Sequence, residues 1–202
     1  IRRARIPIAC LLTESPYFGA LEQTLADIYG AVFTNERVCL KYFRAITPRA
    51  WYLPHAYNPT IHEPGEADSE KRCDAFFVGS WFEERRALLE GADWTGLNFV
   101  WKGHDLSGAA QDVVPNTEAA AWYRSARISL NMHRTTTSNG SGQHIKAGEA
   151  ESLNPRAYEI PACGGFQLMD DSRAEAREVF GESLATYRAG DADDLSRQVR
   201  YW

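Results

Sequence analysis

Short apolar runs alternate with helix-forming segments through most of this chain, and that order limits the folds open to it. The first part is expected to run strand, helix, strand, helix, strand, over residues 6–12, 19–28, 31–34, 37–44 and 51–53. The alternation resumes at a strand over 75–78 and continues to a final helix over 191–202. Strands that alternate with helices favour parallel sheets covered by those helices. We therefore predict an α/β protein with two Rossmann-like units.

A polar break separates the two runs. Residues 57–72 are rich in Pro, Gly and charge and contain few apolar side chains, as interdomain linkers often do. We predict that residues 1–56 are the carboxyl-terminal part of an amino-terminal Rossmann-like domain. Residues 57–72 would then be the linker and 73–202 a carboxyl-terminal Rossmann-like domain. Because the chain starts at Ile1 rather than Met, we expect it to be a segment of a longer protein with an incomplete first domain.

Composition excludes several classes of protein. The formal charge of −5 over 202 residues argues against nucleic acid or a membrane surface as a partner, since both require a basic field. No apolar run approaches the roughly 18 residues of a membrane span, and there is no signal-peptide pattern. The four cysteines are scattered without a CxxC pair, which is typical of a reduced compartment. We expect a cytoplasmic protein.

The turn after the strand at 75–78 is a candidate phosphate site. Gly79 and Ser80 end this strand before a helix, where backbone N–H groups and a positive helix end meet. Arg85 follows in the first turns of that helix and can reach the same anion. The alternative is an ordinary strand-to-helix turn with a solvent-exposed arginine.

Polar residues also follow the next two predicted strands, 97–101 and 128–132. Lys102 precedes a glycine, which permits close backbone approach to a ligand, although a turn glycine beside an incidental lysine fits equally. Asn131 and His133 mark the end of the second strand, where His133 either donates to a phosphate or sugar hydroxyl or fills a polar gap. The histidines lack ligand spacing and no cysteine accompanies them, so we predict no metal site.

The densest polar motif precedes and forms a short helix expected at 156–163. Arg156 lies near the helix start, where its charge and unpaired backbone N–H groups favour a diphosphate. The carboxylate of Glu159 can accept hydrogen bonds from two vicinal ribose hydroxyls. Asn154 precedes the helix, and Gly164 lets the chain leave it. The alternative is a simple Arg–Glu pair on a helix surface.

This motif has a recognisable likeness. The pattern NxRxYExxACGGF, from Asn154 to Phe166, followed by Asp170 and by Phe180–Gly181, resembles the carboxyl-terminal signature of the CgeB-like (spore-maturation type) glycosyltransferases. These belong to the GT-B group and are related to retaining family-4 enzymes. The turn at 77–80 resembles the start of that family's second domain, and 52–56 resembles its crossover from the first.

The resemblance implies a GT-B-like fold, in which two Rossmann-like domains face a cleft and the second holds a nucleotide-sugar donor. Glu159 would hold the ribose, while Asn154, Arg156 and the Gly79–Ser80 turn would lie near the diphosphate. The donor site would thus comprise Gly79, Ser80, Arg85, Lys102, Asn131, His133, Asn154, Arg156, Glu159 and Gly164.

Catalytic roles would fall to Glu159 and Arg156, with Glu14 of the first domain as an acid/base or acceptor contact. Glu14 is equally well explained as a loop carboxylate. Related retaining enzymes carry two glutamates separated by seven residues, and Glu151 has this spacing from Glu159, although it lies in a loop without the expected glycine-rich context.

The predicted function is transfer of a sugar from a nucleotide-diphosphate donor to an unknown glycan, protein or small-molecule acceptor. The reaction is expected to be retaining and metal-independent, with no cofactor besides the donor substrate. The alternative is a non-catalytic nucleotide-sugar or glycan-binding module of the same fold, and a sugar epimerase ranks third. Neither the base, the sugar nor the acceptor follows from the sequence.

Overall fold

The computed structural model describes residues 7–17, 19–104, 111–135 and 149–202. These parts form two compact units, and the chain passes between the units after His55, His133 and Ser152. Residues 57–72, the predicted linker, therefore group with the second unit. The described residues after His133, up to Ser152, group with the first.

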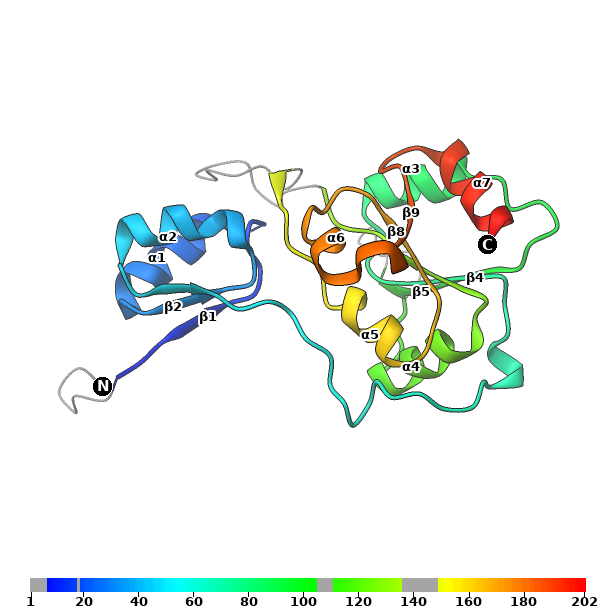
Figure 1. The fold of residues 1–202 in the computed structure, drawn as a ribbon, viewed down its shortest axis with the longest axis horizontal. Coiled ribbons are helices and arrows are strands. Elements are labelled where there is room, and N and C mark those ends of the chain that lie inside the picture. The colour runs from blue at the N-terminus through cyan, green and yellow to red at the C-terminus, as the bar shows by residue number, and fades with distance from the viewer. Residues whose placement is uncertain (1–6, 18, 105–110, 136–148) are drawn as a thin grey trace. The chain divides into compact units, whose positions relative to one another are not determined.

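The first unit contains a three-stranded parallel sheet in the order β1-β2-β3. Its elements are β1 (Cys10–Leu12), α1 (Gly19–Tyr29), β2 (Val32–Thr34), the 3-10 turn η2 (Arg37–Cys39), α2 (Leu40–Ile46) and β3 (Ala50–Tyr52). Both helices lie on one side of this sheet (Figure 1). The core buries Leu12, Val32 and Ala50 of the strands with Ala26 of α1 and Phe43 of α2.

The second unit contains a six-stranded sheet in the order β6-β5-β4-β7-β8-β9. The strands are β4 (Ala75–Val78), β5 (Phe99–His104), β6 (Gln111–Asp112), β7 (Ile128–Asn131), β8 (Gln167–Asp170) and β9 (Ala185–Tyr187). The short strand β6 is antiparallel to β5, and every other pairing is parallel. The predicted α/β fold with parallel sheets is confirmed.

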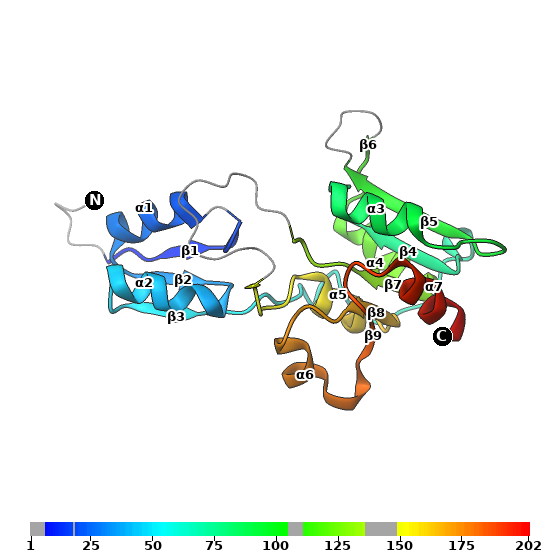
Figure 2. The same cartoon turned by 90° about the horizontal axis from the view of Figure 1, so that it is seen from above.

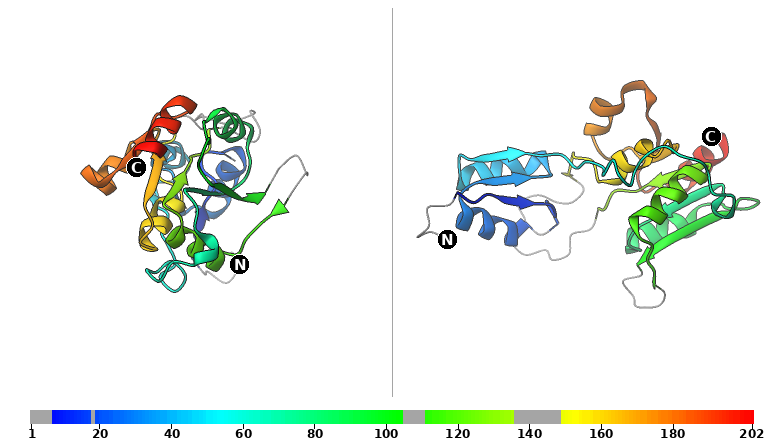
Figure 3. Two further views of the ribbon diagram at one scale, coloured as in Figure 1. Left: turned by 90° about the vertical axis from the view of Figure 1, so that its right-hand side faces the viewer. Right: turned by 90° about the horizontal axis from the view of Figure 1, so that it is seen from below.

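Helices cover both faces of this second sheet, α3 and α7 on one side and α4 and α5 on the other (Figures 1 and 3). The remaining elements are η3 (Ser69–Lys71), α3 (Glu83–Gly91), α4 (Asn116–Ser125), α5 (Arg156–Ala162), α6 (Glu175–Phe180), η5 (Gly181–Ser183) and α7 (Ala192–Tyr201). Phe77 packs with Leu88 of α3, while its neighbour Phe76 stacks on Trp122 of α4 at 5.0 Å between ring centroids. Because both faces are buried, β4 is a continuous apolar run.

The strand order places a topological switch point between β4 and β7. From β4 the chain continues to β5, which pairs with one edge of β4. It later returns to β7, which pairs with the other edge of β4, and then continues outward to β8 and β9. Figure 2 shows β6 and α6 on opposite sides of the second unit. Open α/β sheets bind ligands outside the carboxyl ends of the strands at such a point. The fold therefore directs attention to the ends of β4 and β7.

One predicted strand end is wrong in a way that affects the site. The strand expected to stop at residue 101 continues to His104, because Gly103 and His104 pair with the unpredicted strand β6. Lys102 consequently lies inside β5. No helix among the described residues is long and apolar enough to cross a membrane.

Candidate functional site at the carboxyl ends of β4 and β7

The start of α5 lies against the carboxyl ends of both strands at the switch point. Asn154 Nδ2 donates to Asn131 Oδ1 at 2.7 Å, at the end of β7. Arg156 Nε donates to the carbonyl oxygen of Val78 at 2.7 Å, at the end of β4. The structure thus brings together three of the predicted donor-site residues, Asn131, Asn154 and Arg156.

The guanidinium of Arg156 lies directly over the turn at Gly79. A Cβ atom built on Gly79 would lie 2.5 Å from Arg156 Nη2 and 2.9 Å from Phe77 Cζ. The guanidinium carbon is 5.5 Å from the centroid of the Phe77 ring. Among the described residues, none accepts a hydrogen bond from Nη1 or Nη2. Arg156 therefore presents two donor nitrogens to an anion at this turn.

The backbone of Gly79 is held in place by β5. Gly79 donates its N–H to the carbonyl of Lys102 at 2.9 Å, and its own carbonyl accepts from Trp101 Nε1 at 3.0 Å. A Cβ atom on Gly103 would lie 2.1 Å from the Gly79 carbonyl oxygen. Two glycines in contact let this turn approach the neighbouring strand closely.

Arg85 of α3 links the segments that follow β4 and β7. Its side chain is buried, and it donates from Nη1 to the carbonyl of Ser80 at 3.0 Å and from Nη2 to the carbonyl of Met132 at 2.9 Å. These bonds fix the Gly79–Ser80 turn relative to the end of β7. Because its terminal nitrogens bind backbone carbonyls, Arg85 stabilises the two segments relative to each other rather than reaching an anion.

His133 is buried and bonded through both ring nitrogens. Nδ1 lies 3.0 Å from Asp170 Oδ2, and Nε2 accepts the N–H of Asn154 at 3.4 Å. The backbone N–H of His133 also donates to Asp170 Oδ2 at 2.6 Å, while Asp170 Oδ1 accepts the N–H of Ser172 at 3.1 Å. Both oxygens of Asp170 thus accept backbone N–H groups, as an ionised carboxylate does, and His133 Nδ1 must donate to Asp170.

The protonation states of this pair follow from its surroundings. Burial alone would raise the pKa of Asp170, but the His133 imidazole and the surrounding hydrogen bonds hold that pKa well below its usual value. Burial lowers the pKa of His133, and the opposing effect of Asp170 only partly offsets it. An ionised Asp170 and a neutral His133 protonated on Nδ1 satisfy every contact.

Glu159 lies one turn after Arg156 on α5. Its side chain is 19% exposed, and Oε1 is 4.0 Å from Nε2 of His62. Burial raises the pKa of the Tyr123 phenol; the charge of Arg156 opposes this effect and the charge of Glu159 adds to it. Arg156 and Glu159 therefore both lie near Tyr123, on the α4 side of the sheet.

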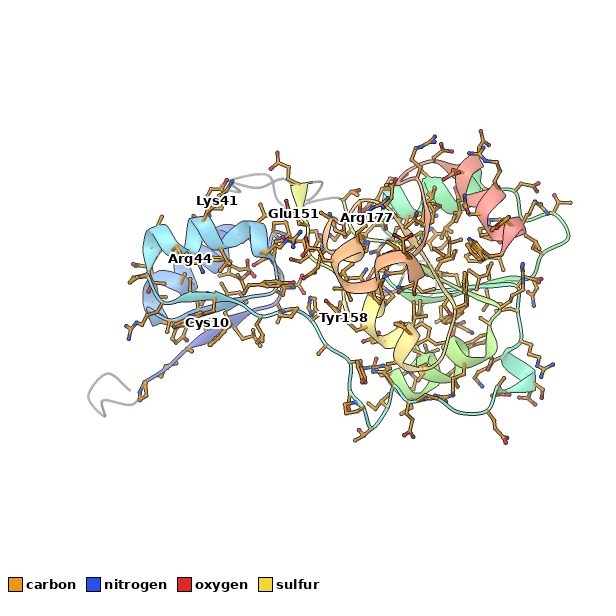
Figure 4. All side chains as sticks on the ribbon, in the orientation of Figure 1. Cys10, Lys41, Arg44, Glu151, Tyr158 and Arg177 are labelled. Atoms are coloured by element: carbon orange, nitrogen blue, oxygen red, sulfur yellow. The ribbon has the colours of Figure 1, made fainter. Side chains whose placement is uncertain are left out.

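Other predicted site residues have different surroundings. Gly164 follows α5 with φ +77° and ends that helix, so it lies at the other end of α5 from Asn154. Lys102 pairs with Asp112 at 2.5 Å. In the first unit, Glu151 (labelled in Figure 4) pairs with Arg37 at 2.7 Å, and the exposed Glu14 donates its backbone N–H to Glu22 at 3.2 Å.

Sequence reasoning counted Asp170 in the family signature and interpreted it as an acid at a helix start, whereas the structure pairs its carboxylate with His133. The signal in the sequence is only that Asp170, like Asn131, ends an apolar strand; that the two strands are neighbours, so that their ends meet at one edge of the sheet, is known from the structure. In the part of the chain that the structure describes, no three His, Cys, Asp or Glu side chains form a group able to hold a metal ion. The metal-independent reaction stays a prediction.

A comparison with protein families identifies the group to which this chain belongs. The model of a family described as "Glycosyl transferase-like" matches residues 72–202, which include the whole six-stranded sheet and the site described above. The chain belongs to this glycosyl transferase-like family. The carboxyl-edge site, from Gly79 to Asp170, therefore lies entirely within the region that defines the family.

A curated relative supports the same assignment. This glycosyl transferase-like chain is 24% identical over 181 residues to the spore protein CgeB of Bacillus subtilis (strain 168). The match covers 82% of this chain and 56% of the relative, so the chain spans about half the length of that protein. The predicted resemblance to CgeB-like glycosyltransferases is confirmed.

Proposed function

We propose that the second unit of this glycosyl transferase-like chain binds the diphosphate of a nucleotide-sugar donor at the carboxyl ends of β4 and β7. The protein containing it would transfer the sugar to an acceptor. The observation that carries the proposal is the anchoring of Arg156. Its Nε is held by the Val78 carbonyl, and its terminal nitrogens face the Gly79 turn without a partner among the described residues.

This arrangement suits the chemistry of sugar transfer. When the bond between the anomeric carbon and the diphosphate breaks, negative charge develops on the leaving diphosphate. A guanidinium already fixed in place stabilises that charge without reorganisation, and its planar fork suits two phosphate oxygens. Because Arg156 supplies the positive charge, the proposed reaction requires no metal ion.

The ribose would be bound one helical turn further along α5. The Glu159 carboxylate is partly exposed and lies on the same helix as Arg156, so the two side chains can contact adjoining parts of one nucleotide. A carboxylate accepts hydrogen bonds from two vicinal hydroxyls. This contact would distinguish a ribonucleotide from a free diphosphate.

The finer features belong to the same proposal. The likeness to CgeB-like enzymes supports a retaining outcome, a GT-B pairing of two domains and a hexose as the transferred sugar. The four free cysteines are the basis for proposing a cytoplasmic location. The acceptor is a glycan, a protein or a small molecule, and its class is left open.

The test is release of nucleoside diphosphate by the intact protein from UDP-, GDP-, ADP- and dTDP-activated sugars, with binding followed by thermal shift. Arg156→Ala and Glu159→Ala are expected to abolish turnover. Arg197→Ala is the matched control, because Arg197 lies on α7 with its side chain 62% exposed. Donor binding without turnover on any acceptor, water included, would favour a non-catalytic binding module. Absence of binding to all four donors would overturn the proposal.

A further inference from the structure

A buried hydrogen-bonded chain runs from β8 to the start of α5. It begins at the Asp170 carboxylate, passes through the imidazole of His133 and ends at the backbone N–H of Asn154. The His133 side chain is only 2% exposed. Since both ring nitrogens contact protein atoms, neither is left to bind a donor molecule.

The far end of this chain is the residue that sets the position of α5. Asn154 Nδ2 bonds to Asn131 at 2.7 Å, and its Oδ1 accepts the N–H of Ala157 at 3.2 Å, inside the first turn of the helix. The preceding N–H, of Leu153, donates to Glu175 Oε2 at 2.7 Å. Two consecutive backbone N–H groups are thus held by side chains, and Arg156 follows two residues later.

We propose that Asp170 and His133 are positioning residues for the diphosphate site: Asp170 selects the Nδ1–H form of His133, and the lone pair on Nε2 then holds Asn154 and, through it, Arg156. The inference rests on the proposed function and assigns to His133 a role other than donor contact. Neither residue touches the diphosphate in this account.

The tautomer is essential to the arrangement. If Nε2 carried a proton, it would face the N–H of Asn154, and two donors would oppose each other with no acceptor between them. Asp170 excludes that state because its carboxylate can only accept, which places the imidazole proton on Nδ1. The contact to Asn154 therefore depends on a carboxylate two hydrogen bonds away.

The surrounding charges also favour a neutral ring. Besides Asp170 from β8, the charged groups that face His133 are Arg156 from α5 and Arg173 from the turn before α6. Arg85 of α3 donates to the carbonyl of the adjacent Met132. The guanidinium groups of Arg156 and Arg173 oppose an imidazolium. Above about pH 6.5, the usual pKa of histidine, the ring should therefore be neutral, and protonation of His133 should weaken diphosphate binding only under more acidic conditions.

The first test needs no ligand. In ¹⁵N NMR spectra of the full chain, the His133 ring is expected in the Nδ1–H form at neutral pH. Asp170→Asn removes the negative charge that holds the proton on Nδ1 and should raise the fraction of the Nε2–H form. The control Asp171→Asn removes a neighbouring exposed carboxylate and should leave the tautomer unchanged. An Nε2–H ring in the wild-type protein would overturn the proposal.

The second test measures binding of inorganic pyrophosphate and of UDP, GDP, ADP and dTDP by calorimetry. Asp170→Asn is expected to weaken pyrophosphate binding about tenfold, the equivalent of one hydrogen bond, whereas Asp171→Asn should stay within about twofold. His133→Gln, whose side-chain oxygen can accept from Asn154, should bind better than His133→Ala. Thermal unfolding establishes that each variant is folded.

The outcomes separate this inference from the proposed function. Unchanged pyrophosphate affinity in folded Asp170→Asn and His133→Ala would overturn the positioning role. If wild-type protein binds none of the five probes, the proposed function fails, and the tautomer experiment still decides whether Asp170 sets the state of His133. If Asp170→Asn does not fold, the wild-type tautomer and the comparison of His133→Gln with His133→Ala decide the question.

Discussion

Replacing Gly79 with alanine should weaken the diphosphate site mainly by displacing Arg156, although the backbone φ of +155° at this position also disfavours any side chain. The added Cβ would lie 2.5 Å from Arg156 Nη2 and 2.9 Å from Phe77 Cζ. Neither separation is tolerable between non-bonded heavy atoms, so the guanidinium must shift away from its position over the turn. The Phe77 ring is fully buried and has little room to move away.

The expected magnitudes follow from the contacts that are lost. Displacing Arg156 breaks its bond to the Val78 carbonyl, which costs about 1 kcal/mol of folding free energy, and crowding of Phe77 adds roughly 1–2 kcal/mol. A hydrogen bond to a charged group contributes about 1.5–3 kcal/mol. Loss of the guanidinium from the site should therefore weaken nucleoside diphosphate binding roughly ten- to hundredfold.

The assay is a double-mutant cycle by calorimetry. Affinity for the tightest-binding member of UDP, GDP, ADP and dTDP is measured for wild type, Gly79→Ala, Arg156→Ala and the double variant. Because the alanine acts mainly by moving Arg156, most of its effect on affinity should disappear once Arg156 is absent. Wild-type affinity in a folded Gly79→Ala protein would refute this reasoning, and so would full additivity of the two substitutions.

Three further predictions concern neighbouring groups. Glu159→Gln should weaken binding of ribonucleoside diphosphates about tenfold but leave pyrophosphate affinity unchanged, because only the ribose contacts this side chain. Calorimetry with both ligands tests this prediction, and equal losses of affinity for the two ligands would contradict it. The pKa values of His133 and Asp170 are both depressed in the folded state, so the unfolded state binds protons first as the pH falls. The free energy of unfolding should therefore decrease below about pH 6.5, where His133 of the unfolded chain is protonated, and more steeply below about pH 4, where Asp170 of the unfolded chain is protonated. Urea titrations should show that Asp170→Asn lacks the lower phase, and an unchanged acid profile would count against the pair. In the first unit, Glu36→Ala should lower the free energy of unfolding by about 2–4 kcal/mol, because the buried carboxylate accepts hydrogen bonds from the N–H groups of Val38, Glu151 and Ser152. Urea unfolding measures this change, and a decrease below about 1 kcal/mol would show that water replaces the carboxylate.

Local signals predicted much of the fold. The strand at Ala75–Val78 and the helix beginning at Glu83 follow from continuous apolar character and a helical pattern, which depend on near neighbours in the chain. The end of β5 could not be predicted in this way. It is set by pairing of Gly103 and His104 with β6, and no local pattern signals a two-residue partner strand.

Sequence reasoning grouped residues that lie in one segment or at a recognisable strand end. It placed Asn154 and Arg156 together because both belong to the start of one helix, and added Asn131 because it ends a buried strand; the structure brings these three residues together. The sequence could not show that Arg85 braces two backbone carbonyls or that His133 pairs with Asp170, which is 37 positions away. Those contacts depend on strand order, and strand order is a long-range property of the sheet.

The central claim is that a nucleoside diphosphate binds at the carboxyl ends of β4 and β7. The most direct measurement maps backbone amide NMR shifts in the full chain while UDP, GDP, ADP or dTDP is added. The account predicts the largest changes at Gly79, Ser80, Asn154 and Arg156, and their loss in Arg156→Ala. Saturable binding with its largest changes away from these four residues would contradict it.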